Sequence, residues 1–278
     1  MAEGRLYIGN RRYSSWSMRG WLAVRLAGLD VEEEVVPFTR PGPTAAIRAV
    51  SPTGLVPCLA HRGVLVWESL AICEYCAEQA PALWPSDPVA RAQARSASAE
   101  MHAGFAALRE AMWMNLGADF AGRGRTPGAL ADIARIEALW TEARARSGGP
   151  FLFGAAFTAA DAMFAPVMAR FLTWRPELSG DSLAYCAAVR AHPLVAAWYD
   201  AAAREPPSWL LADYEAAPGG AAAGSPRAAH LGAVPPSSEP APKPEPSPKP
   251  LPKEIGGPSG PEPTRYGDWE RKGRCIDF

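Results

Sequence analysis

Prolines are concentrated in one part of this chain. Fourteen of the 29 prolines in its 278 residues lie between Pro218 and Pro263, and the stretch PKPEPSPKPLPK has one at nearly every second position. Proline has no backbone N–H to donate to a helix or a sheet, so such a run favours an extended polyproline II spacer. We therefore expect a disordered linker over residues 217–258 and a folded body that ends near residue 216. A ligand for proline-binding domains is the alternative interpretation.

The first 83 residues alternate between short strand patterns and helix patterns. The strand patterns are RLYIG, VEEEVVP, LVPCLA and VLVWE, and the helix patterns are SMRGWLAVRLAG and SLAICEYCAEQA. The first strand, helix and strand favour parallel pairing, whereas HRG between the last two strands is short enough only for an antiparallel hairpin. This pattern predicts an α/β domain over residues 1–83, built on a mixed sheet.

Residues 88–216 differ in composition, because they are rich in Ala, Leu, Arg and Glu and show no convincing strand. Apolar residues recur at helical spacing over residues 89–117, 128–148, 159–174 and 182–205. Asp87 and Pro88 are well suited to begin the first of these helices. We expect an all-α domain, a helical bundle that packs beside the α/β domain.

Composition excludes several classes of partner. The 28 basic and 29 acidic residues give a net charge of −1, which provides no electrostatic basis for binding nucleic acid or an anionic membrane. No apolar run approaches the ~18 residues of a spanning helix, and the N-terminus has no signal-peptide pattern. Five scattered cysteines indicate reduced thiols and no metal site, so we expect a cytoplasmic protein. Two small helix residues explain the CEYC motif better than a redox or zinc site does.

The segment YSSWSMRGW places three hydroxyls, those of Ser14, Ser15 and Ser17, between the first strand pattern and the first helix pattern. Hydroxyls and backbone N–H groups at the start of a helix favour an anion, because the positive end of the helix dipole lies there. Helix capping is the simpler interpretation, and Ser17 alone would serve as the N-cap. Capping leaves the other two serines unexplained.

Two further segments carry the chemistry of a binding site. SPTGLVPCL places Pro57 at the entrance of a strand, where a cis peptide bond would expose the backbone of Val56 to a ligand. VLVWESLAI ends a strand at Glu68 and begins a helix at Ser69. A carboxylate and a hydroxyl at this second helix N-terminus could bind both an α-ammonium and an α-carboxylate group.

These segments, in this order, resemble the glutathione transferase superfamily over residues 5–215, and SSWS followed by Met18 and Arg19 is most similar to its zeta-like, serine-type members. The resemblance implies a thioredoxin-like N-terminal domain, an all-helical C-terminal domain and a homodimer formed through the N-terminal domain. FTAADAMFAPV is similar to the buried capping box of the family, with Thr158 as the cap and Asp161 three residues later. Trp16 stands where the isomerases of the zeta-like group have cysteine, which argues against isomerase activity.

The resemblance also assigns roles to residues. Ser14, with Ser15 as its alternate, would donate a hydrogen bond to the sulfur of glutathione, the co-substrate, which attacks a small electrophile. Val56, followed by cis Pro57, would pair its backbone with the tripeptide, and Glu68 and Ser69 would hold the γ-glutamyl end. A free thiol has a pKa of about 8.5, and a hydroxyl bond together with a helix N-terminus could lower it by about one to two units.

The last 20 residues form a second motif. GPEPTRYGDWERKGRCIDF resembles the C-terminal signature of the succinate dehydrogenase assembly factor 4 family, which implies the flavoprotein subunit of succinate dehydrogenase as partner. We expect residues 259–278 to fold on binding, because aromatic and basic side chains on a flexible arm suit such a role. The expected partner-binding residues are Arg265, Tyr266, Gly267, Asp268, Trp269 and Phe278. The alternative to an enzyme is a non-catalytic interaction protein whose body is only a scaffold.

Overall fold

The computed structural model describes residues 2–38, 44–216, 270–271 and 274–275 of the chain. Residues 235–278 form a unit separate from the body, and the structure describes one antiparallel pair within it, β5 (Glu270–Arg271) and β6 (Arg274–Cys275). The expected linker, residues 217–258, lies outside the described residues. The same holds for the expected partner-binding residues, which are Arg265, Tyr266, Gly267, Asp268, Trp269 and Phe278.

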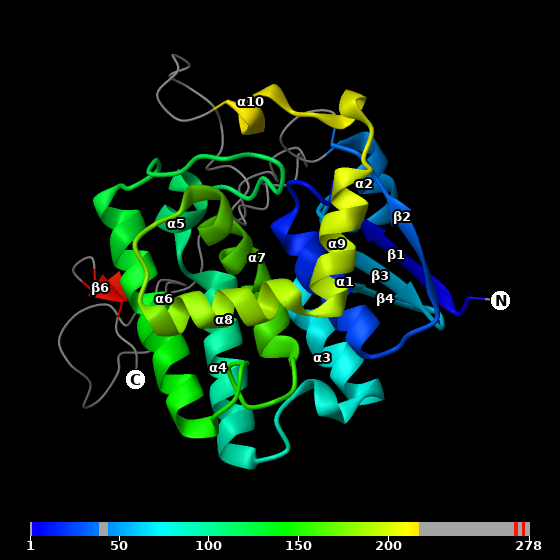
Figure 1. The fold of residues 1–278 in the computed structure, drawn as a ribbon. Coiled ribbons are helices and arrows are strands. Elements are labelled where there is room, and N and C mark those ends of the chain that lie inside the picture. The colour runs from blue at the N-terminus through cyan, green and yellow to red at the C-terminus, as the bar shows by residue number, and fades with distance from the viewer. Residues whose placement is uncertain (1, 39–43, 217–269, 272–273, 276–278) are drawn as a thin grey trace, which may run out of the picture. The chain divides into compact units, whose positions relative to one another are not determined.

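The N-terminal domain is built on a four-stranded mixed sheet with the strand order β2-β1-β3-β4 (Figure 1). Its elements are β1 (Gly4–Ile8), α1 (Ser15–Leu26), β2 (Val31–Val35), α2 (Ala45–Val50), β3 (Cys58–His61), β4 (Val64–Trp67) and α3 (Ser69–Gln79). β1 and β2 pair in parallel, whereas β3 pairs antiparallel with both β1 and β4. The predicted pairing and the thioredoxin-like fold are confirmed. The short helix α2 was not expected from the sequence.

The two faces of this sheet are covered by different elements. Successive residues of a strand point to opposite faces, and in β1 the fully buried Leu6 and Ile8 belong to the large core that includes α1 and α3. Tyr7, between them, packs instead with a small cluster that contains Ile47 of α2 and Val56. Helices α1 and α3 therefore pack on one face of the sheet, and α2 and Val56 pack on the other.

The second domain consists of helices, as predicted. They are α4 (Pro88–Ala103), α5 (Ala106–Ala111), α6 (Pro127–Ser147), α7 (Ala159–Trp174), α8 (Gly180–Ala191), α9 (Pro193–Ala203) and α10 (Ala212–Glu215), with the 3₁₀ turns η1 (Pro81–Leu83) and η2 (Pro207–Trp209). The expected single helix over residues 89–117 is wrong, because the backbone is extended at Gly104 and left-handed at Phe105 (φ 59°). Pro193 likewise divides the expected helix 182–205 into α8 and α9.

Helix α7 is the centre of the helical domain, and all of its residues except Leu172 are buried. It packs against α1 of the N-terminal domain as well as against α4 and α8. The predicted capping box is present: the Asp161 carboxylate accepts hydrogen bonds from the Thr158 backbone N–H (2.8 Å), the Thr158 hydroxyl (2.9 Å) and the Leu152 N–H (3.0 Å). This box fixes the position of α7 and, through it, the surroundings of α1.

In the part of the chain that the structure describes, no helix combines the length and the apolar character that crossing a membrane requires.

Candidate functional site

Helix α1 begins at the predicted serine cluster, with Ser14 as its N-cap. The Ser14 hydroxyl accepts a hydrogen bond from the Ser17 N–H (3.3 Å) and donates one to the Ser17 hydroxyl (2.7 Å), which also accepts a bond from the Gly9 N–H (3.0 Å). The interpretation that Ser17 caps this helix is wrong, because the cap is Ser14 and the helix begins three residues earlier, at Ser15. Hydroxyl hydrogens rotate, so the Ser14 hydrogen can turn from the Ser17 hydroxyl to a ligand.

Ser15 is the first residue of α1, and its side chain is also buried. Its hydroxyl oxygen accepts a hydrogen bond from Nη2 of Arg170 on α7, at 3.2 Å. An oxygen that accepts from a guanidinium keeps its own hydrogen to donate. Both predicted serines are therefore able to donate to an anion at the positive end of α1.

The segment with the predicted backbone contact approaches the same helix. The Val56–Pro57 peptide bond is cis, and both residues are buried. Gly20 of α1 faces this segment so closely that a Cβ atom there would lie 2.7 Å from Cγ of Pro57. A glycine at this position lets α1 and the Val56–Pro57 segment lie in direct contact.

Glu68 and Ser69 lie at the N-terminus of α3. Glu68 is the N-cap, with a left-handed φ of 69° and an exposed carboxylate. The Ser69 hydroxyl is buried and has no hydrogen-bond partner among the described residues. Buried polar groups normally have a partner, so this hydroxyl has a hydrogen bond left to make with a group outside the described residues.

Two side chains connect the N-termini of α1 and α3. The Trp16 ring makes an edge contact with His102 of α4, with ring centroids 5.1 Å apart, and Nε2 of His102 lies 3.7 Å from the Glu68 carboxylate. Burial lowers the pKa of His102 although Glu68 opposes it, so the ring is neutral at neutral pH. The fold thus links Glu68, at the start of α3, through His102 to Trp16 in the first turn of α1.

Three arginines surround Trp16 and the serines. The guanidinium of Arg19 lies 4.4 Å from the Trp16 ring centroid and that of Arg109 lies 5.4 Å from it, while Arg170 contacts Ser15. Arg19 is fully buried: its Nε donates to the Met163 carbonyl (2.8 Å), but Nη1 and Nη2 have no hydrogen-bond partner in the described part of the chain. Within the ranges that the structure describes, Arg109 is attracted by the Asp132 carboxylate, whereas no carboxylate influences the pKa of Arg19 or Arg170.

Burial lowers the pKa of all three arginines, and repulsion within the group lowers that of Arg19 and Arg170 further. Burial lowers the pKa of Arg19 well below its usual value, and repulsion from Arg170 and Arg109 lowers it further. The pKa of Arg170 falls to about 9 for the same two reasons, burial and the charge of Arg109. Buried positive charges without an acidic partner are costly, and such perturbed groups in a cleft are typical of functional sites. This cluster, Arg19, Arg109 and Arg170, is called the arginine cluster below.

Sequence reasoning did not find the arginine cluster. One signal was available in α7, where Arg170 is the only basic residue in a strongly apolar helix, and a buried basic residue without a nearby acid is rare. The meeting of Arg109 with Arg19 could not be read from the sequence, because it depends on the break between α4 and α5.

Tyr13 and the two cysteines of the CEYC motif are unsuited to activating a thiol. The Tyr13 hydroxyl donates to Glu215 (2.5 Å) and accepts from the Leu211 N–H (3.2 Å), and burial followed by the Glu215 bond raises its pKa to about 12. Cys73 and Cys76 are buried in α3, and burial raises the pKa of both thiols, that of Cys76 to about 12. They are neutral, packed side chains.

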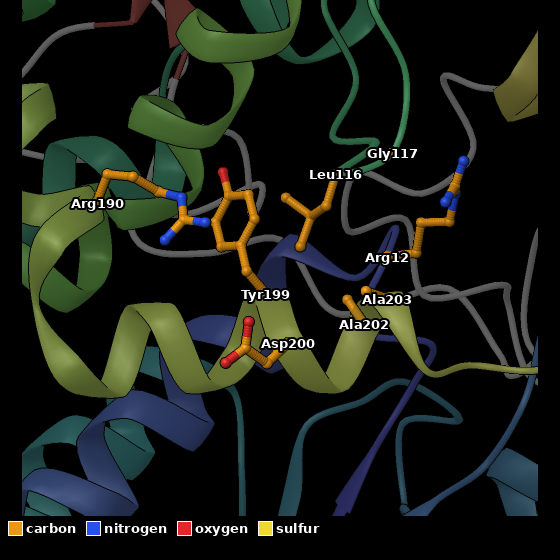
Figure 2. A pocket seen from close by; sticks show the side chains of 8 residues that line it. All are labelled: Arg12, Leu116, Gly117, Arg190, Tyr199, Asp200, Ala202 and Ala203. Carbon is orange, nitrogen blue, oxygen red and sulfur yellow. The ribbon is translucent and has the colours of Figure 1, made fainter.

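A pocket of about 210 Å³ lies between α9 and the turn at residues 116–117 (Figure 2). It is lined by Arg12, Leu116, Gly117, Arg190, Tyr199, Asp200, Ala202 and Ala203. None of the predicted site residues is among these. The pocket is therefore distinct from the serine and arginine cluster, although Arg12 directly precedes Tyr13 and Ser14 in the chain.

Comparison with protein families matches three parts of the chain. Residues 13–79 match the family described as glutathione S-transferase, N-terminal domain, and residues 91–201 match its C-terminal domain. Residues 235–278 match a family described as a protein of unknown function, DUF1674. This third match begins within the stretch that was expected to be linker.

Individual relatives agree with these assignments. A probable maleylacetoacetate isomerase from Caenorhabditis elegans is 33% identical over 105 residues, which are 37% of this chain and 48% of the relative. A UPF0369 protein from Rickettsia felis is 69% identical over 26 residues, which are 9% of this chain and 33% of the relative. The chain thus spans about half of the isomerase and a third of the UPF0369 protein.

Among solved structures, a theta class glutathione S-transferase from Xanthomonas axonopodis pv. citri with glutathione bound superposes with a TM-score of 0.55 and 27% identity. The match covers 72% of this chain and 98% of that one.

Proposed function

Because residues 13–79 and 91–201 belong to the glutathione S-transferase family, we propose that this protein binds glutathione as co-substrate, stabilises its thiolate at the N-terminus of α1, and transfers it to a small electrophile that carries a carboxylate. Ser14 or Ser15 donates the hydrogen bond to sulfur. The backbone of Val56 pairs with the tripeptide beside cis Pro57, and Glu68 and Ser69 hold its γ-glutamyl end.

The proposal for glutathione is supported most directly by Ser69, whose buried hydroxyl has no partner within the described ranges. A carboxylate of the γ-glutamyl group would supply that partner and would also lie at the positive end of α3. Glu68, exposed beside it, can bind the ammonium group of the same ligand. The α1 N-terminus then receives the sulfur, because His102 links Glu68 to Trp16 in the first turn of α1.

The arginine cluster supports the proposal that the second substrate carries a negative charge. Arg19 has two buried N–H groups without a partner in the described chain, and Arg170 and Arg109 add two more positive charges next to Ser15 and Trp16. A carboxylate would offset this uncompensated charge. In the reaction the thiolate sulfur forms a bond to an electrophilic carbon, and a leaving group such as chloride departs with the electron pair of its bond.

We favour transfer over isomerisation, although one relative is named a probable maleylacetoacetate isomerase. The resemblance places a cysteine at position 16 in that group, and this chain has Trp16 there, held between Arg19, Arg109 and His102. The indole narrows the space next to the serines, and it offers an aromatic face to a substrate instead of a thiol.

Two electrophiles that differ only in charge test this function. The rate of glutathione consumption is measured with chloroacetate and with chloroacetamide, each divided by its uncatalysed rate. We expect a larger enhancement for the acid. In Arg109→Gln the value of kcat/KM for chloroacetate should fall by ~10–100-fold, the loss of one charge-assisted hydrogen bond, while the value for the amide changes little.

Arg146→Gln is the matched control, because Arg146 is an exposed arginine on α6 that pairs with Glu142 in its own helix. Equal enhancement of the acid and the amide, or equal losses for both in Arg109→Gln, would contradict a carboxylate site. No enhancement with either electrophile would contradict the transferase itself.

A second function is supported by the C-terminal match to DUF1674 and by the 69% identity with the UPF0369 protein. We propose that residues 259–278 bind the flavoprotein subunit of succinate dehydrogenase through Arg265, Tyr266, Gly267, Asp268, Trp269 and Phe278. Capture of that subunit by the full chain, lost on deletion of residues 259–278, is the expected result. Capture that does not depend on these residues, or no capture at all, would contradict it.

We propose the cytoplasm as the compartment, since the described cysteines are free thiols.

We further propose a homodimer formed through the N-terminal domain. Strand β4 is the edge of the sheet, and Val64 (48% exposed), Leu65 (42%) and Trp67 (43%) leave an apolar strip on it. An exposed apolar edge is typical of an interface. Leu65→Lys should convert a dimer into a monomer in sedimentation equilibrium. A wild-type monomer, or an unchanged Leu65→Lys dimer, would contradict this interface.

A further inference from the structure

The segment that follows α9 is bonded to the loop that precedes the serines. The Glu205 carboxylate accepts hydrogen bonds from the backbone N–H groups of Arg11 (2.6 Å) and Arg12 (3.2 Å). Farther along the segment, the Trp209 carbonyl accepts a bond from the Asn10 side-chain amide (3.2 Å). Residues about 190 positions apart are joined here, so the end of the helical domain fixes a loop of the N-terminal domain. Residues 205–215 are called the strap below.

Glu215, at the end of the strap, has the most bonds to this loop. Its carboxylate accepts hydrogen bonds from Nε and Nη2 of Arg12 (2.9 and 3.1 Å), from the Tyr13 hydroxyl (2.5 Å) and from the Asn115 amide (3.0 Å). The Tyr13 hydroxyl also accepts from the Leu211 N–H, and the Tyr13 ring packs on Tyr214, with centroids 5.2 Å apart. A single carboxylate therefore holds the two residues that directly precede Ser14.

At neutral pH the ionised Glu215 carboxylate and the protonated Tyr13 hydroxyl keep these bonds in place. Burial alone would raise the pKa of Glu215, but the bonds from Arg12, Tyr13 and Asn115 outweigh it and hold the pKa below its ordinary value. Tyr13 stays a neutral donor, because its pKa is about 12. The bidentate pairing with Arg12 also has a defined geometry.

Arg12 is confined from its other side as well. Its guanidinium lies against Gly117, where a Cβ atom would come within 1.9 Å of Nη1. Gly117 and Arg12 both line the pocket of Figure 2. An alanine at position 117 would push the end of the Arg12 side chain away from Glu215 without changing any residue of the strap or of the serine cluster.

We propose that Glu215 is a positioning residue for the reaction: by holding Arg12 and Tyr13 it sets the position of the Ser14 and Ser15 hydroxyls at the start of α1. This inference rests on the proposed function. It places the effect of Glu215 on the thiolate and not on the affinity for glutathione, because the strap has no described bond to Val56, Pro57, Glu68 or Ser69.

The test is the pH profile of kcat/KM with a neutral aryl halide, in the full chain. In Glu215→Gln and in Gly117→Ala the midpoint should rise by about one pH unit, which corresponds to a tenfold weaker preference for the thiolate, with KM for glutathione nearly unchanged. Glu215→Asp, which keeps a carboxylate, should raise the midpoint less than Glu215→Gln does. Glu78→Gln, an exposed carboxylate on α3, is the control. Gly117→Ala gives an independent result if Glu215→Gln does not fold.

Wild-type turnover with unchanged midpoints in Glu215→Gln and Gly117→Ala would overturn the inference and leave the proposed function intact. A rise in KM with an unchanged midpoint would also overturn it, since this would be a binding effect. A wild type that does not consume glutathione would overturn the proposed function, and the inference with it.

Discussion

Ser15 and Arg170 are 155 positions apart in the sequence, yet their side chains meet at 3.2 Å. The serines could be predicted from the sequence because three hydroxyls lie together before one helix pattern. Their basic neighbours could not, because Arg109 and Arg170 reach Trp16 and Ser15 only through tertiary packing of α5 and α7 on α1. Residue identity therefore predicted the serine cluster, and the fold revealed the charge that surrounds it.

At the scale of single residues, alanine substitution can distinguish the roles of Ser14 and Ser15. Each oxygen already accepts one bond, Ser14 from the Ser17 N–H and Ser15 from Arg170, so only the one that donates to sulfur should matter for the thiolate. We expect one of Ser14→Ala and Ser15→Ala to lose ~10–100-fold in kcat/KM with an aryl halide, the value of one hydrogen bond to a charged group. Ser86→Ala, an exposed serine between α3 and α4, is the control. Unchanged turnover in both variants would exclude the serine mechanism.

At the scale of elements, the strands and their pairing followed from the sequence because apolar residues alternate along them and HRG allows only a hairpin. Helix ends were harder to predict. Gly104 and Pro193 divide stretches whose apolar spacing continues across the break, and α2 is only six residues long. The spacing of apolar residues predicts which face of a helix is buried, but it does not predict where the backbone turns.

The contact between α1 and the Val56–Pro57 segment leads to a prediction about glutathione binding. In Gly20→Ala the new Cβ would meet the Pro57 ring at 2.7 Å, and a proline ring cannot rotate away. Displacement of that segment should raise KM for glutathione by about tenfold, since a shift of ~1 Å near a site can cost up to a hundredfold. Gly180→Ala, at an exposed helix start with nothing within 4 Å, should leave KM unchanged. Equal KM values in both variants would refute the contact's role.

The capping box of α7 leads to a prediction about stability. In Asp161→Ala the Thr158 N–H, the Leu152 N–H and the Tyr185 hydroxyl lose a buried acceptor. The free energy of unfolding from urea titration should fall by about 3 kcal/mol or more, because each buried group left without a partner costs ~1–3 kcal/mol. Thr158→Ala should cost about 1 kcal/mol, the usual value of a helix cap. A loss of less than about 1 kcal/mol in Asp161→Ala would show that the capping box contributes little to stability.

For the whole molecule, the sequence separated the body from its C-terminal part by proline content alone, and the family matches fall on either side of that division. The last described bonds of the body join Glu215 to Arg12 and Ala216 to Ala212. We therefore expect a chain that ends at residue 216 to keep the wild-type melting temperature and kcat/KM.

A chain that ends at Arg204, which lacks the strap, should lose activity by contrast. Full activity in the shorter chain would show that the strap is dispensable. Reduced activity in the longer one would mean that residues 217–278 contribute to the reaction.

The central claim is that the N-terminal domain binds glutathione and favours its thiolate. Ultraviolet absorbance of the thiolate, titrated against pH with saturating protein and compared with free glutathione, measures this directly. We expect the bound thiol to ionise about one to two units below the free value of about 8.5. A bound thiol that titrates at the free value, or no saturation at millimolar glutathione, would contradict the account.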